Sequence, residues 1–243
     1  MISSAEEVMG TVVSFLIDPG PLNGEEVDQA LEQARRELHE LDERFSLWKS
    51  ESELCRWRAG LVSEPSALMD EVIELCAGAY DITKGLFDAW ALPGGFDPTG
   101  LVKGWAAQRA LDHLVSAGVA GALVNAGGDI CVAPGGSYEV GIRHPSDPTA
   151  LCGVVDVTGA VATSGIYERG VHLVHPFAGE VAGVAATVVG ESLVVCDVLA
   201  TALVVGGSDV LFLMEELSGF EGFFVDHDGF MYTTSAMSFS NPT

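Results

Sequence analysis

The segment at residues 96–106 contains the side chains best suited to bind a phosphate group. It holds Asp97, Thr99 and Lys103, and Lys103 is one of only three lysines in the chain. Because proline excludes the residue before it from helical conformations, the Asp-Pro pair favours a turn. We predict a helix that begins at about Gly104, and the free N–H groups at a helix start attract anions. The segment therefore suits a phosphorylated ligand, although a turn with no function, placed before a helix, would have the same composition.

A second pair of polar side chains lies in an apolar stretch further along the chain. Residues 193–205 read as a buried helix, in which Asp197 and Thr201 are four residues apart and therefore share one face. A carboxylate in such a helix is costly unless it is paired or binds a cation. Carboxylate and hydroxyl oxygens together suit Mg²⁺. The alternative is structural: the Asp caps a neighbouring element and the Thr hydrogen-bonds to its own helix.

Three further segments carry weaker signals. Residues 124–130 read as a strand that runs into Gly-Gly-Asp, which most often is a plain turn. His172 and His175 would face opposite sides of a strand, so we do not expect them to hold a metal together. Trp48 follows the end of a predicted helix, where it could belong to the core or form a platform for a flat ring system.

The net charge restricts the possible partners. The chain of 243 residues has 35 acidic and 11 basic side chains, which gives a formal charge of −24. Such a field repels nucleic acid and anionic membranes, so we expect neither as a partner. An anionic ligand would need local cations or a metal ion. An acidic surface that serves solubility or salt tolerance explains the same composition.

The first residues and the cysteines point to the cytoplasm. Residues 1–8 have no basic region and no long apolar region, so we do not expect a signal peptide. No run approaches the roughly 20 apolar residues that a membrane span requires. The five cysteines are scattered without a Cys-x-x-Cys pair, as is typical of reduced core residues. We therefore expect a cytoplasmic protein that does not insert into membranes.

Hydrophobic periodicity and turn residues predict an α+β fold, in which helices pack on mixed or antiparallel sheets in one interlocked unit. We expect this unit to be a single domain over residues 1–243. Besides the helix from Gly104, we expect helices at residues 25–45, 68–79, 193–205 and 210–217. We expect strands at residues 9–17, 122–125, 138–143, 153–157, 160–163, 171–174 and 185–189. Residues 222–232 read as a hairpin that turns at residues 226–229.

Taken in order, these segments resemble one family, the FAD:protein FMN transferases known as the ApbE family. The similarity runs from Met9 to the predicted helix with Asp197 and Thr201, about four-fifths of the chain. Five blocks match the family in order and spacing: Arg-Phe-Ser-Leu-Trp followed by Ser-Glu-Leu at residues 44–54, and residues 97–106, 123–130, 164–169 and 197–203.

The resemblance implies a Mg²⁺-dependent enzyme that takes FAD as its substrate, attaches FMN to a threonine hydroxyl of an acceptor flavoprotein and releases AMP. It implies that Asp197, Thr201 and a backbone carbonyl near Val102 bind the metal. It places Lys103 near the pyrophosphate, and His172 is the candidate that assists deprotonation of the threonine. The residues implied to bind FAD are Met9, Ser46, Trp48, Glu53, Asp97, Thr99, Gly128, Asp129, Ser164 and Gly165.

The chain departs from the family pattern at two neighbouring positions. Where the family usually has Asp, this chain has His175, and Phe177 stands where a basic residue often follows the proline. Two alternatives to the transferase therefore remain. The same site could hydrolyse FAD to FMN and AMP with water as the nucleophile, or the chain could be a flavin-binding protein that has lost catalysis. Many relatives are exported lipoproteins, whereas here we expect the acceptor to meet the enzyme in the cytoplasm.

Overall fold

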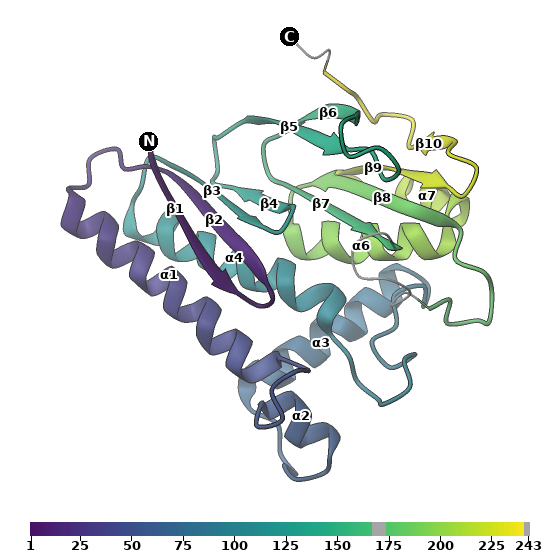
Figure 1. Ribbon diagram of the computed structural model, residues 1–243, viewed down its shortest axis with the longest axis horizontal. Coiled ribbons are helices and arrows are strands. Elements are labelled where there is room, and N and C mark those ends of the chain that lie inside the picture. Colours follow the sequence, from purple (N-terminus) through teal and green to yellow (C-terminus); the bar gives the residue numbers. More distant parts are fainter. Residues whose placement is uncertain (167–173, 241–243) are drawn as a thin grey trace.

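The computed structural model describes residues 1–166 and 174–240, which form a large antiparallel sheet with helices on one face (Figure 1). Eight strands are hydrogen-bonded in the order β1-β2-β3-β4-β7-β8-β9-β10, and every neighbouring pair is antiparallel. Their bounds are β1 Ile2–Val8, β2 Thr11–Asp18, β3 Gly121–Ala126, β4 Asp129–Val132, β7 Ala160–Gly165, β8 Gly183–Gly190, β9 Phe220–Asp226 and β10 Met231–Thr233.

Three helices cover one face of this sheet: α1 (Gly24–Phe45), α4 (Thr99–Ala117) and α6 (Leu193–Gly206) (Figure 1). They enclose the main hydrophobic core between themselves and the strands. α6 contacts both β7 and β8, and α4 packs against α1 and α6. A helix surrounded in this way must be apolar on all sides, which is why residues 193–205 carry so few polar side chains. The remaining helices are α2 Glu53–Arg58, α3 Ala67–Ile82 and α7 Ser208–Met214.

A hairpin of β5 (Tyr138–Arg143) and β6 (Leu151–Val157) covers part of the opposite face (Figure 1). It forms a second, smaller apolar cluster with residues from β4, β7 and β9. β4 is therefore buried on both sides: Cys131 belongs to the main core, while Ile130 and Val132 belong to the second cluster. Because side chains alternate between the faces of a strand, Asp129 points to the same side as Cys131, toward the helices.

The approach of α4 to α6 depends on a residue without a side chain. A Cβ atom on Gly104 would lie 3.0 Å from Oδ2 of Asp197 and 3.2 Å from the carbonyl oxygen of Leu193. Both contacts are tighter than ordinary van der Waals distances. Gly104 therefore allows the two helices that carry the candidate site residues to come together.

The α+β class, with helices packed on antiparallel sheets, is confirmed. The predicted helix start at Gly104 is wrong, because α4 begins five residues earlier, at Thr99. The predicted strand at residues 9–17 is in fact two strands, joined by a turn in which Met9 and Gly10 have positive φ angles of 56° and 70°. β1, β4 and α2 were not expected, and most of the predicted strand at residues 171–174 lies outside the described residues.

Candidate functional site

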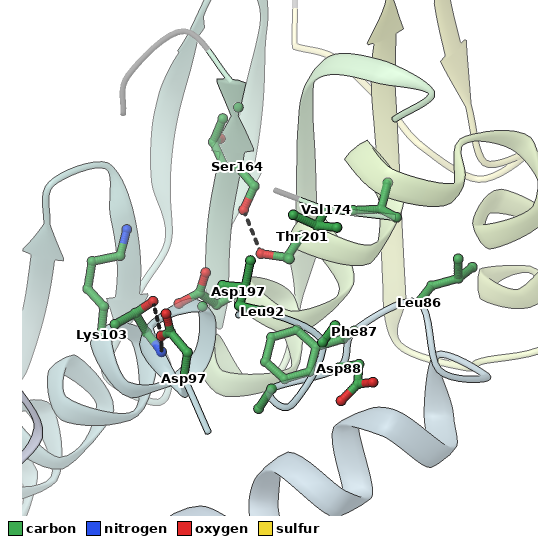
Figure 2. A pocket seen from close by; sticks show the side chains of 17 residues that line it. Leu86, Phe87, Asp88, Leu92, Asp97, Lys103, Ser164, Val174, Asp197 and Thr201 are labelled. Atoms are coloured by element: carbon green, nitrogen blue, oxygen red, sulfur yellow. Dashed lines mark hydrogen bonds between the residues drawn. The ribbon is translucent and has the colours of Figure 1, made fainter. Parts of the chain in front are cut away.

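The first turn of α4, the C-terminal end of β7, α6 and the loop after α3 surround one cavity (Figure 2). The cavity volume is about 110 Å³, well below the roughly 300–1,000 Å³ of pockets that enclose a whole small-molecule ligand. It therefore suits phosphate groups better than an entire dinucleotide. The expected site residues that line it are Asp97, Thr99, Lys103, Ser164, Gly165, Asp197 and Thr201.

Asp197 and Thr201 present their oxygen atoms to this cavity from one face of α6, as their spacing predicts. Asp197 is only 3 % exposed, and its Oδ2 accepts the backbone N–H of Gly104 at 3.2 Å. The Thr201 hydroxyl lies 3.0 Å from the hydroxyl of Ser164 on β7 (Figure 2). Ser164 therefore helps to fix the rotamer of Thr201.

These two side chains fit a Mg²⁺ ion, which prefers hard oxygen ligands. Among residues 1–166 and 174–240, no group of three or more His, Cys, Asp or Glu side chains is placed to hold a metal. One carboxylate and one hydroxyl would form only part of an octahedral shell. Mg²⁺ commonly binds through one or two carboxylates and completes its shell with substrate phosphates and water. The site therefore suits a metal that binds together with a phosphorylated substrate.

Asp97 and Thr99 line the cavity at the start of α4. Oδ1 of Asp97 accepts the backbone N–H of Thr99 at 3.1 Å and its hydroxyl at 2.7 Å. The carboxylate thus satisfies a donor that the start of a helix otherwise leaves free. It also places a negative charge at the helix end that would attract an anion, so a phosphate group here needs a compensating cation.

Lys103 provides a positive charge at the cavity wall, from the second turn of α4. Its side chain is 17 % exposed and forms an ion pair with Oδ2 of Asp129. Asp129 is 1 % exposed and does not line the cavity. Its Oδ2 lies against Lys103, and direct contact of Asp129 with FAD stays a prediction.

Comparison with known proteins identifies the family. The model described as ApbE family matches residues 92–224, more than half of the chain. The chain belongs to the ApbE family. A FAD:protein FMN transferase from Vibrio cholerae is 24 % identical over 83 % of this chain and 80 % of its own length. A protein of the same name from Klebsiella pneumoniae is 38 % identical over 28 % of this chain and 22 % of its own length.

Solved structures of ApbE proteins share the fold. The ApbE protein from Thermotoga maritima superimposes with a TM-score of 0.83 at 18 % identity, over 96 % of this chain and 97 % of its own. The flavin transferase ApbE from Vibrio cholerae gives a TM-score of 0.78 at 20 % identity, over 97 % of each chain. At such low identity the likeness establishes the architecture and leaves the role of each side chain to the local geometry.

Other residues of the ApbE motifs lie away from the cavity. Met9 and Gly128 belong to the turns between β1 and β2 and between β3 and β4, and neither lines the cavity. The two turns adjoin, because a Cβ atom on Gly127 would lie 2.4 Å from the hydroxyl oxygen of Thr11. Gly128 donates its N–H to Oδ1 of Asn125 at 2.8 Å. The Gly-Gly pair thus has a structural role in this turn, and binding of FAD by Met9 and Gly128 stays a prediction.

Three more of the predicted residues, Ser46, Trp48 and Glu53, lie between the end of α1 and the start of α2. Trp48 is 97 % exposed, and Ser46 accepts its backbone N–H at 3.2 Å. Glu53 forms an ion pair with Arg44 and accepts the N–H of Ser66 at 2.7 Å and its hydroxyl at 2.9 Å. Burial raises the pKa of Glu53, but these hydrogen bonds and the Arg44 charge outweigh it, so the pKa lies below its usual value. Glu53 therefore connects the end of α1 with the start of α3, while Trp48 stays accessible to a ligand.

Two predicted site residues remain, His172 and Val102. His172 lies outside the described residues. Val102 lies inside the first turn of α4 with its side chain in the core and away from the cavity. A carbonyl at that point of a helix is directed along the axis to the residue four positions further on. We therefore base the metal site on Asp197 and Thr201.

His175, where ApbE proteins usually have Asp, shapes a turn. Its Nδ1 accepts the backbone N–H of Phe177 at 3.2 Å. Asp88 makes the same type of contact, because its Oδ1 accepts the N–H of Trp90 at 2.8 Å. A carboxylate at position 175 could accept the same bond. The substitution is therefore compatible with the local backbone.

The loop between α3 and α4 supplies cavity residues that sequence reasoning missed, above all Phe87, Asp88 and Leu92 (Figure 2). Among the described residues, Asp88 raises the number of carboxylates that line the cavity to three, with Asp97 and Asp197, against one ammonium, that of Lys103. No motif in the sequence marks this loop. The excess of negative charge strengthens the case for a cation that accompanies an anionic ligand.

Proposed function

We propose that this chain is a FAD:protein FMN transferase that depends on Mg²⁺, attaches FMN to a threonine of an acceptor flavoprotein and releases AMP. One observation carries the proposal: a carboxylate and a hydroxyl on α6 converge with an ammonium and the start of α4 on one cavity of phosphate size. Membership of the ApbE family and the names of the relatives from Vibrio cholerae and Klebsiella pneumoniae support the reaction.

In this proposal the pyrophosphate of FAD occupies the cavity. Lys103 and the first turn of α4 attract its negative charge. Asp197 and Thr201 would hold Mg²⁺, which would neutralise negative charge on the phosphate groups as it builds up in the transition state. Because the cavity has no room for the flavin ring system, the ring extends outside it. Trp48 is sufficiently exposed to stack against the ring.

The transfer exchanges one bond for another at phosphorus. The threonine oxygen of the acceptor forms a bond to the phosphorus of the FMN half, and the bond from that phosphorus to the bridging oxygen breaks. AMP leaves with the bridging oxygen and its electron pair. The proton of the threonine hydroxyl must be removed during attack, and His172 is the candidate that takes it.

We also propose that the acceptor meets this enzyme in the cytoplasm. No helix in the described ranges combines the length and the apolar character needed to span a membrane.

The proposal is tested by incubating the protein with FAD and MgCl₂, with and without a small FMN-binding domain as acceptor. Covalent flavin on the acceptor, with AMP in solution, is the expected result. Free FMN and AMP that form equally well without acceptor would identify a hydrolase instead. Intact FAD bound to the protein, with no product, would identify a flavin-binding protein without catalysis.

A further inference from the structure

Asp129 is a buried carboxylate whose contacts connect two walls of the cavity. It is 1 % exposed at the start of β4 and faces the helices. An ionised carboxylate at such a place is strongly unfavourable unless it is paired and hydrogen-bonded. Its two oxygens divide this requirement between them: Oδ2 forms an ion pair with the ammonium of Lys103 but has no partner in hydrogen-bond geometry among the described residues, and Oδ1 accepts the backbone N–H of Thr163 at 3.1 Å.

The contact with Thr163 places the end of β7. The pairing of β4 with β7 covers Ile130 with Val161 and Cys131 with Ala160. Beyond these pairs, the Asp129 side chain takes the N–H of Thr163. Thr163 and the following Ser164 both line the cavity, and Ser164 is the partner of Thr201. Asp129 therefore supports the wall that fixes a proposed metal ligand.

The contact with Lys103 has a second consequence. Lys103 shares the cavity with Asp97 and Asp197, both of which could attract its ammonium. Figure 2 shows the Lys103 side chain extending away from Asp97. An ion pair with Asp197 would occupy the carboxylate that we assign to Mg²⁺. The ion pair with the buried Asp129 instead keeps the Lys103 ammonium at the cavity wall, so that it does not compete with Mg²⁺ for Asp197.

We propose that Asp129 is a positioning residue, which holds the Lys103 ammonium where it meets the pyrophosphate of FAD and keeps it from Asp197. This inference rests on the proposed function and assigns Asp129 another role than the direct FAD ligand that the family resemblance implies. Asp129 does not line the cavity and pairs with Lys103, so its effect passes through Lys103.

The main test uses Asp129→Asn, which keeps an oxygen that can accept the Thr163 N–H but removes the charge that pairs with Lys103. We expect FAD binding in the presence of MgCl₂ to weaken by roughly 10- to 100-fold, the range for a misplaced hydrogen bond to a charged group. Asp112→Asn is the matched control, because it makes the same change on an exposed side chain of α4 that accepts a bond from Gln108. The control should bind FAD as the wild type does.

A double-mutant cycle separates positioning from a purely structural role. If Asp129 acts through Lys103, Asp129→Asn weakens FAD binding no further in a Lys103→Met background. Losses that add in the double variant would overturn the proposal. Urea unfolding of all variants shows whether the folded state is retained.

A labelling experiment without FAD keeps the inference distinct from the proposed function. Acetic anhydride labels the amines of Lys103 and of the exposed Lys84, which serves as the internal reference. Asp129→Asn should raise the labelling of Lys103 relative to Lys84 by roughly tenfold, because the amine is no longer held in a charge-assisted contact with a buried carboxylate. An unchanged ratio would overturn the inference even if the wild type transfers FMN. A raised ratio in a protein that binds no FAD would instead refute only the proposed function.

Discussion

Gly104→Ala tests whether the close approach of α4 and α6 builds the site. The added Cβ atom would lie 3.0 Å from Oδ2 and 3.1 Å from Cβ of Asp197, so one of the two helices must move. Overpacking of this kind typically costs about 1–3 kcal/mol. Alanine in place of glycine inside a helix offsets about 1 kcal/mol of this cost. The expected net loss in the free energy of unfolding is therefore about 0–2 kcal/mol.

Gly78→Ala is the matched control, because Gly78 lies in α3 and its Cβ position has no heavy atom within 4 Å. The control should raise the free energy of unfolding by about 0.5–1 kcal/mol, the ordinary helix-propensity gain. Urea unfolding gives the stabilities, and calorimetric titration of MgCl₂ into the protein with FAD gives metal affinity. We expect Gly104→Ala to weaken metal binding, because the displaced carboxylate is Asp197. Equal stabilisation by both substitutions, with unchanged metal affinity, would refute the reasoning.

Two further predictions concern the loop between α1 and α2. Trp48→Ala should weaken FAD binding, measured by flavin fluorescence, by about 0.5–1.5 kcal/mol, the order of an aromatic stacking contact. Leu61→Ala, at another exposed apolar residue, is the control, and equal affinity in both variants would remove Trp48 from the site. The pKa of Glu53 is lower in the folded state than in the unfolded state. Ionised Glu53 therefore adds to the free energy of unfolding above its unfolded-state pKa, and this contribution is lost as the pH falls through its folded-state pKa. The stability of Glu53→Gln, followed by urea unfolding from pH 7 to pH 3, should therefore fall less steeply than that of the wild type, and parallel curves would contradict this assignment.

Sequence periodicity predicted the elements whose burial follows a simple rule. The helix at residues 25–45 has one apolar face, and the structure shows α1 at Gly24–Phe45. β5 matches its predicted bounds, residues 138–143. β4 was not predicted, because all four of its residues are buried and its sequence therefore shows no alternation of apolar and polar side chains.

The site was only partly visible in the sequence, for a physical reason. The spacing of Asp197 and Thr201 places them on one helix face in any context, and the structure brings them together at the cavity. Gly104 suggested a loop boundary, whereas it lies inside α4 because another helix needs the space of its side chain. Phe87 and Asp88 reach the cavity because the α3–α4 loop packs against α4 at Gly100 and against α6 at Gly206, and no local pattern encodes such contacts.

The central claim is that metal held by Asp197 supports transfer of FMN to another protein. Intact-mass spectrometry of the acceptor domain, after incubation with FAD and either MgCl₂ or EDTA, tests it directly. Asp197→Asn keeps an oxygen for the Gly104 N–H, and Asp209→Asn changes an exposed acid on the neighbouring α7. We predict an acceptor heavier by one FMN group with the wild type and Asp209→Asn in MgCl₂, and an unchanged mass in EDTA or with Asp197→Asn. Full modification by a folded Asp197→Asn variant, or in EDTA, would contradict the account.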